Sequence, residues 1–215
     1  IDGKELYNIK KDPGQEKDIA KKNIEKVAEM RDAYENWWAY ISRDFSRFEA
    51  YKVGEPGIKE TTITVHDLHS DDPLAWNQAY IRDPNSGKKP AFAEGFYMID
   101  VLQDGYYEVE LRRWPKESKL AFNATLPQLG TKKEWYVPRP EGVVLPLKSA
   151  SIDIDALHLD RPVDMKNDNV TFNAYLVKGR KRLEANFVGD DDTCFGAFYV
   201  YMRKVDAKSA QKKIK

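Results

Sequence analysis

The sequence predicts a mostly β protein, in which a jelly-roll-like β-sandwich follows one N-terminal helix. Apolar residues recur every three or four positions before residue 50, the period of a helix face, and every second position after residue 57, the period of a strand. Gly, Pro, Asn and Asp separate the later runs, as is typical of sandwiches. We expect a strand–turn–helix segment at 1–52, the sandwich at 53–205, and a disordered basic tail at 206–215.

The first segment opens with a short alternating run at 5–9, which predicts a strand, and continues with a turn at 11–14. Asn23 is a candidate helix N-cap. The apolar stripe that follows consists of Val27, Met30, Tyr34, Trp37, Trp38, Ile41, Phe45 and Phe48. We expect this face to pack in a core, with contact to a partner helix as the alternative.

The later part of the chain contains the strand-like runs. They cover residues 62–65, 95–101, 105–113, 152–157, 170–177, 183–188 and 195–202. The Gly-containing segments 103–105 and 178–180 predict two hairpin turns. Prolines between residues 115 and 146 predict loops or sheet edges in the middle of the chain.

Composition excludes several classes of function. The chain has 215 residues with 35 Lys+Arg and 35 Asp+Glu, so it lacks the surplus of cations that non-specific nucleic-acid binding needs. One cysteine excludes an intrachain disulfide. The apolar runs fall short of the roughly 20 residues of a membrane span. Because the sequence begins at Ile1, without Met and within an expected strand, we expect a processed product or a fragment.

One loop after the first predicted strand of the sandwich concentrates polar and aromatic side chains. The candidate substrate-binding residues there are His66, Asp67, His69, Trp76, Asn77 and Gln78. Imidazole, carboxylate and amide groups hydrogen-bond sugar hydroxyls, and an indole can stack on a pyranose ring. A metal site is a weaker alternative, because His-x-x-His in a loop does not impose ligand geometry. A loop held by its own hydrogen bonds is the third alternative.

Three other features have competing interpretations. Strand alternation sends Arg112 and Arg113 to opposite faces. We expect one of them to pair with an internal carboxylate and the other to meet solvent or a ligand, and Arg112 is the candidate ligand contact. Cys194 lies next to a strand that looks buried, which does not favour a catalytic thiol. The acidic run 190–192 could hold calcium, but its spacing favours a polar turn.

Several stretches resemble the formylglycine-dependent sulfatases. Residues 4–16 are similar to the family's C-terminal strand and "DPGE" turn, and Trp37-Trp38 to the end of the helix that follows. The stretches that resemble the β-rich extension of a bacterial arylsulfatase subgroup are 64–69, 76–78, 105–115 and 196–201. This resemblance implies the C-terminal region of a sulfatase, with a strand–turn–helix piece of its C-terminal subdomain in front of the sandwich.

The resemblance also implies what this chain lacks. Calcium and the formylglycine nucleophile, made from a C/S-x-P-x-R motif, would belong to a catalytic domain upstream in the same polypeptide, and no cofactor is expected in this chain. Cys194 lacks the Pro and Arg of that motif, so we assign no catalytic residue. The expected role is to complete the fold of a periplasmic or secreted sulfuric ester hydrolase and to help bind sulfated carbohydrate or aryl sulfate. The alternative is a free-standing carbohydrate-binding module or a structural interaction domain.

Overall fold

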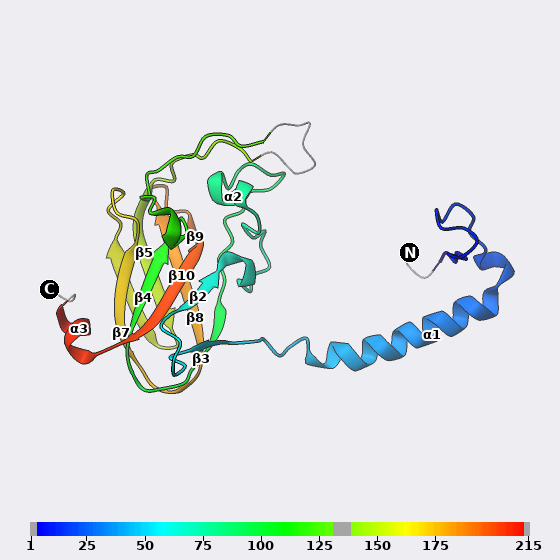
Figure 1. Cartoon of the computed structure of the whole chain (residues 1–215), viewed down its shortest axis with the longest axis horizontal. Helices are drawn as coiled ribbons and strands as arrows, with labels where there is room; N and C mark the ends of the chain where they lie inside the picture. Colours follow the sequence, from blue (N-terminus) through cyan, green and yellow to red (C-terminus); the bar gives the residue numbers. More distant parts are fainter. Residues whose placement is uncertain (1–3, 131–138, 213–215) are drawn as a thin grey trace. The chain divides into compact units, whose positions relative to one another are not determined.

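A computed structural model describes residues 4–130 and 139–212, with side chains up to residue 210. The chain divides into two compact units, Ile1–Phe48 and Glu49–Lys215, which we call the N-terminal unit and the sandwich unit (Figure 1). The first boundary expected from the sequence was at residue 52.

The N-terminal unit consists of a looped segment and one long helix. It contains η1 (Ala20–Lys22), α1 (Ile24–Ile41) and η2 (Ser42–Asp44). Residues 5–9, where the alternation predicted a strand, are irregular and lead into a turn. The carboxylate of Asp12 closes that turn by accepting hydrogen bonds from the backbone N–H of Glu16 at 3.0 Å and of Lys17 at 2.9 Å. These local hydrogen bonds take the place of strand pairing, because the segment has no second strand beside it.

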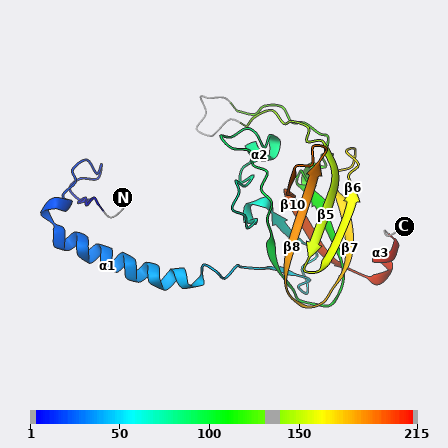
Figure 2. The same ribbon diagram turned by 180° about the vertical axis from the view of Figure 1, so that it is seen from behind.

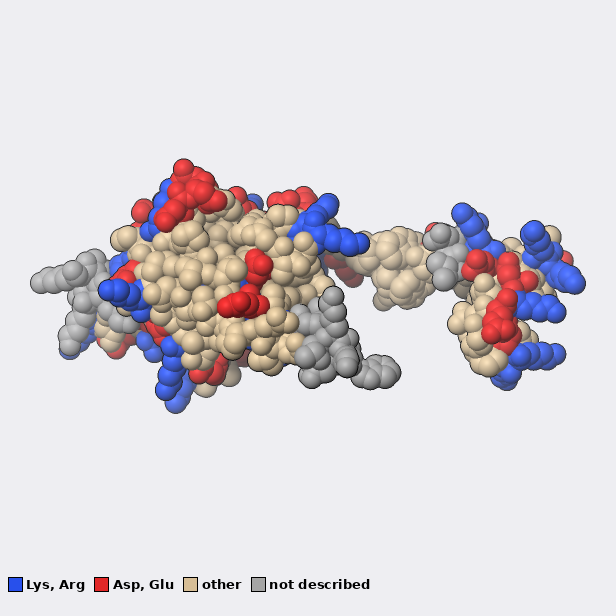
Figure 3. All heavy atoms as spheres, turned by 90° about the horizontal axis from the view of Figure 1, so that it is seen from above, with Lys and Arg blue, Asp and Glu red and all other residues tan. Residues whose placement is uncertain are grey.

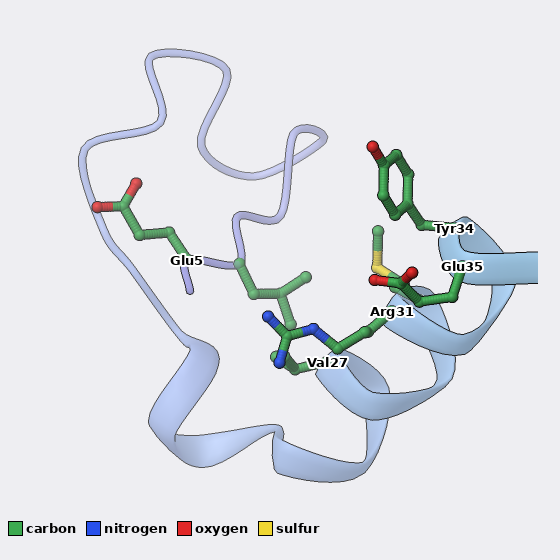
Figure 4. A pocket seen from close by; sticks show the side chains of 7 residues that line it. Glu5, Val27, Arg31, Tyr34 and Glu35 are labelled. Atoms are coloured by element: carbon green, nitrogen blue, oxygen red, sulfur yellow. The ribbon is translucent and has the colours of Figure 1, made fainter. Parts of the chain in front are cut away.

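The apolar stripe of α1 does not form a buried core within this unit. No residue of α1 is buried, and Trp37 is 52% exposed. The aromatic rings contact one another instead, with Trp38 stacked on Tyr34 at 6.2 Å and edge-on to Phe45 at 5.2 Å between ring centres. An apolar hollow of about 580 Å³ separates the looped segment from the helix near Val27 (Figure 4). The stripe finds no core within its own unit, because the described residues 4–48 supply one α-helix and no second layer. That this face packs in a core formed with another segment stays a prediction.

The sandwich unit contains two sheets. The six-stranded sheet runs in the order β1 (Tyr51–Val53), β3 (Tyr97–Val101), β8 (Gly179–Gly189), β5 (Leu147–Ile154), β6 (Leu157–Pro162), with β9 (Cys194–Gly196) also paired to β8. The four-stranded sheet runs in the order β2 (Thr61–Thr64), β10 (Tyr199–Val205), β4 (Gly105–Arg112), β7 (Val170–Leu176). This confirms the predicted β-sandwich (Figures 1 and 2).

Alternation along the strands builds the core between the sheets. Ile99 and Ile152 of the six-stranded sheet and Val109 and Phe172 of the four-stranded sheet are at most 1% exposed and belong to one apolar cluster. Their neighbours in sequence point to the outside, because successive strand residues face opposite ways. Basic and acidic side chains both lie on the outer surface of the sandwich unit, as Figure 3 shows for one face.

The two predicted hairpins are wrong. β3 and β4 lie in different sheets, and so do β7 and β8, so segments 103–105 and 178–180 cross from one sheet to the other. The backbone N–H of Lys178 donates to Asp104 at 2.6 Å, which ties the two crossings together. A hairpin that the Gly and Pro pattern missed joins β5 to β6 through Asp155, whose φ is 52°. Aspartate tolerates this left-handed conformation without a glycine.

Short helices complete the sandwich unit. They are η3 (Val65–Asp67), α2 (Gln78–Arg82), η4 (Lys116–Ser118) and α3 (Ala207–Lys212). α3 lies where the sequence predicted a disordered tail at 206–215, and Asp206 stabilises its start by accepting from the backbone N–H of Ser209 at 2.8 Å. Among the described residues, no helix is long and apolar enough to cross a membrane.

Candidate functional site

A pocket of the sandwich unit lies beside two edge strands, one from each sheet. β1 is the first strand of the six-stranded sheet and β2 the first strand of the four-stranded sheet, so both are edge strands. η3 follows β2 directly, and His69 then pairs with Phe96 through two backbone hydrogen bonds of 2.9 and 3.1 Å. These bonds hold the loop that contains His66, Asp67 and His69 against the start of β3.

A pocket of about 490 Å³ opens at this edge, and we call it the Tyr51–Asp67 pocket. Its lining consists of Glu49, Ala50, Tyr51, His66, Asp67, Leu68, His69, Tyr97 and Met98. Tyr51 is in register with Ile99, and residues two apart in a strand share a face, so Tyr51 and Tyr97 lie on the same side of the sheet. The loop from the opposite sheet supplies the facing groups.

A short hydrogen bond joins the two sheets inside the pocket. The Tyr51 hydroxyl donates to Oδ2 of Asp67 at 2.5 Å, and the Thr64 hydroxyl donates to the same oxygen at 3.4 Å. Burial, then the hydrogen bond to Asp67, raises the pKa of Tyr51, so the phenol stays protonated and remains a donor. Oδ1 of Asp67 has no hydrogen-bond partner in the described part of the chain, which leaves it as an acceptor for a ligand.

Tyr97 contributes a buried hydroxyl to the same wall. The side chain is 1% exposed, and its Oη has no hydrogen-bond partner among the residues that the structure describes. Burial raises the pKa of Tyr97, with smaller contributions from Tyr51 and Asp67, so this hydroxyl is neutral at every physiological pH. An unpartnered buried hydroxyl costs about 1–3 kcal/mol.

The two imidazoles frame the pocket differently. His66 is exposed, whereas His69 is half-buried with its ring 5.2 Å from that of Phe96. The ring nitrogens of His66 and Oδ1 of Asp67 are polar groups at the pocket that can hydrogen-bond a sugar hydroxyl. Residues 4–130 and 139–210 contain no group of three or more His, Cys, Asp or Glu side chains placed to hold a metal ion.

The second half of the predicted loop lies outside this pocket lining. Asn77 is the N-cap of α2, because its Oδ1 accepts from the backbone N–H of Ala79 at 2.8 Å and of Tyr80 at 3.3 Å. Gln78 lines a different, smaller cavity. Trp76 is 63% exposed, with its ring centre 6.2 Å from that of Tyr80, so its stacking face remains available.

Arg112 occupies a structural position on the four-stranded sheet. Its Nη1 pairs with Asp168 at 2.7 Å and its Nε pairs with Glu110, and the residue is 6% exposed. Both arms of the guanidinium are engaged, so we do not place Arg112 in the pocket. Arg113 faces the other side of the strand, as the alternation predicted, and is fully buried.

The remaining polar features have local roles. Burial, with a further contribution from Glu94, raises the pKa of the Cys194 thiol to about 11, which opposes a nucleophilic role. In the loop after β8, Asp191 accepts from the backbone N–H of Thr193 at 3.0 Å, and Asp192 pairs with Lys148. These are the contacts of a polar turn.

Sequence reasoning did not select Tyr51 and Tyr97. Both lie in short strands, where a tyrosine is an ordinary core residue. The alternation that places Tyr97 inward is visible in the sequence, but its approach to Asp67 depends on which strands form the sheet edges.

Solved structures with partial similarity to the chain include two mannanases and a CBM35. No family model matches the chain, and no curated protein is significantly similar to it. A ruminal GH26 endo-beta-1,4-mannanase is 15% identical with a TM-score of 0.37, over 73% of this chain and 27% of that one. A CBM35 from Cellvibrio japonicus Abf62 is 9% identical with a TM-score of 0.36, over 67% and 92%. A Podospora anserina GH26-CBM35 beta-(1,4)-mannanase is 7% identical with a TM-score of 0.35, over 68% and 28%.

The expected sulfatase relationship is wrong. No family model matches the chain, and the structures named above are mannanases and a carbohydrate-binding module instead of sulfatases. The chain spans about a quarter of the two mannanases, and at these TM-scores no function is transferred from any of the three.

Proposed function

We propose that the sandwich unit is a carbohydrate-binding module and that the Tyr51–Asp67 pocket holds a neutral sugar unit. The observation that supports this most directly is Oδ1 of Asp67, an acceptor without a partner among the described residues, in a pocket also lined by Tyr51 and His66. A site whose polar groups lack partners gains most from a ligand rich in hydroxyls, since each new hydrogen bond removes an unsatisfied group.

The volume and opening of the pocket suit one end of a saccharide. About 490 Å³ exceeds what a single hexose ring fills, and the position at a sandwich edge gives a chain of sugars an exit to solvent. Asp67 is held by Tyr51 and Thr64, so its free oxygen is oriented before the ligand arrives. Such preorganisation reduces the entropy cost of binding.

A catalytic domain as partner in the same polypeptide, in a periplasmic or secreted location, is part of this proposal. A module that binds a polymer raises the effective concentration of an attached enzyme at that polymer. The second candidate role is a structural or partner-binding domain, and the ligand test separates the two.

Titration of the full chain with soluble mannan, xylan and dextran tests the proposal, with binding followed by calorimetry and by affinity electrophoresis. We expect saturable binding to at least one polysaccharide and a loss of about tenfold or more in affinity for Asp67→Asn, because the amide replaces a charged acceptor. Asp190→Asn, an exposed acid outside the pocket lining, is the matched control and should bind as the parent chain does. Absence of binding to all three polysaccharides refutes the module, and equal losses in both variants refute the pocket.

A further inference from the structure

A second, smaller cavity lies beside α2 and η4 in the sandwich unit. Its volume is about 120 Å³, and Arg82, Trp114, Leu126 and Tyr199 contribute to its wall. None of these residues lines the Tyr51–Asp67 pocket. The volume admits a group of a few heavy atoms, since a water molecule occupies about 30 Å³ in the liquid, and it excludes a sugar ring.

Arg82 places a largely buried cation at this cavity. It is 7% exposed, and its Nη1 donates to the carbonyl oxygens of Pro127 at 2.7 Å and Pro140 at 3.2 Å. Nε and Nη2 of Arg82 have no hydrogen-bond or ion-pair partner in the described ranges 4–130 and 139–210. Two donor groups of a buried guanidinium are therefore available at the cavity.

A second buried cation lies on the same stretch of backbone. Arg113 is fully buried, and its Nη2 donates to the carbonyl oxygens of Val143 at 2.5 Å and Arg82 at 3.1 Å. Its guanidinium lies 4.6 Å over the ring of Trp114, the residue that also lines the cavity. Carbonyl oxygens hold both cations, and Arg113 also lies over an aromatic face; neither forms a salt bridge to a described carboxylate.

The electrostatic balance around the cavity favours an anion. Burial is the main factor that lowers the pKa of Arg82, and the nearby charge of Arg139 lowers it further. Burial also lowers the pKa of Arg113, to about 10, against a weaker opposing effect of Asp83. Buried charges are normally paired, because an uncompensated one loses its hydration without a substitute. A negative group in the cavity would supply the missing partner.

A planar carboxylate fits these donors best. Nε and Nη2 of one guanidinium form the fork that binds both oxygens of a carboxylate in parallel. Burial raises the pKa of Tyr199, so its hydroxyl stays protonated as a further donor in the wall. We propose that this cavity binds a small carboxylate anion of the size of acetate, with Arg82 as the charged donor.

The test is a titration of the 15N-labelled full chain with sodium acetate at pH 7, with sodium chloride adjusted to keep the ionic strength constant. The reporter is the indole N–H resonance of Trp114, identified by its absence in Trp114→Phe. We expect a saturable shift with acetate and none with glucuronate, whose ring exceeds the cavity. A shift that is absent, that does not saturate, or that glucuronate reproduces overturns the proposal.

Two variants locate the effect. Arg82→Gln removes the charge and should raise the half-saturating acetate concentration by about tenfold or more. Leu126→Phe keeps both cations but fills the cavity, and it should abolish the shift while circular dichroism stays that of the parent chain; this variant alone decides if Arg82→Gln does not fold. Lys178→Gln, which removes one cation outside the cavity lining, is the control and should leave the titration unchanged. An undiminished shift in Leu126→Phe places the anion elsewhere and refutes the site.

Discussion

Replacing Tyr97 by phenylalanine should not destabilise the ligand-free protein, although Tyr97 is among the most deeply buried side chains. The ring, which is 1% exposed, keeps its packing, and the lost hydroxyl has no partner in the described structure. Removing an unpartnered buried polar group recovers part of its desolvation cost of about 1–3 kcal/mol. We expect a gain of about 1 kcal/mol, or a rise in Tm of about 2–4 °C for a unit of this size.

Tyr107→Phe is the matched control for this prediction. Tyr107 is also fully buried, but its hydroxyl donates to the carbonyl oxygen of Gln103 at 2.7 Å. Its removal breaks that bond and should cost about 1 kcal/mol, so the two Tyr→Phe variants should differ in sign. Urea unfolding followed by tryptophan fluorescence measures both midpoints. A loss of stability in Tyr97→Phe as large as in Tyr107→Phe would show that the Tyr97 hydroxyl is satisfied in the folded protein.

Two further predictions concern the backbone and pH. Gly54→Ala should lower the free energy of unfolding in urea by about 2 kcal/mol or more, because φ is +76° and the new Cβ would lie 2.1 Å from Oη of Tyr107. Gly57→Ala is the control, with φ +86° but no atom within 4 Å of the new Cβ, and it should cost only about 1 kcal/mol. Equal losses in the two variants would contradict the steric cause. The hydrogen bond to Asp153 raises the pKa of His158 above the ordinary 6.5, so this contact stabilises the fold at acidic pH and is lost as pH rises through the raised value. NMR titration should give a lower midpoint in Asp153→Asn, and an unchanged midpoint would exclude the contact.

The local periodicity of the sequence was sufficient to predict most strands and the position of α1. The run at 105–113 became β4, Gly105–Arg112, and the run at 170–177 became β7, Val170–Leu176. The connections were not predictable in the same way. A Gly-containing segment can form a hairpin turn or a crossing between sheets equally well. Which of the two connections forms depends on which strands compete for the same sheet edge.

The candidate pocket was likewise predictable from the sequence only in part. The loop with His66, Asp67 and His69 stood out because its polar side chains cluster in sequence. Its partners Tyr51 and Tyr97 come from strands about 15 and 30 residues away, and their meeting requires β1 and β2 to be the edges of two different sheets. Arg112 shows the reverse case, since its carboxylate partner Asp168 lies 56 residues away and only the fold brings them together.

The sequence by itself determined the fold class, the balance of charge, and the place where the spacing of apolar residues changes from that of a helix to that of a strand. These features depend on composition and on contacts within a few residues. Only the tertiary structure decided which sheet each strand joins, that the aromatic face of α1 finds no core in its own unit, and that Arg82 lines a cavity without an ion pair to a described carboxylate. These features arise from contacts between distant segments, where the free energy of packing outweighs local preference.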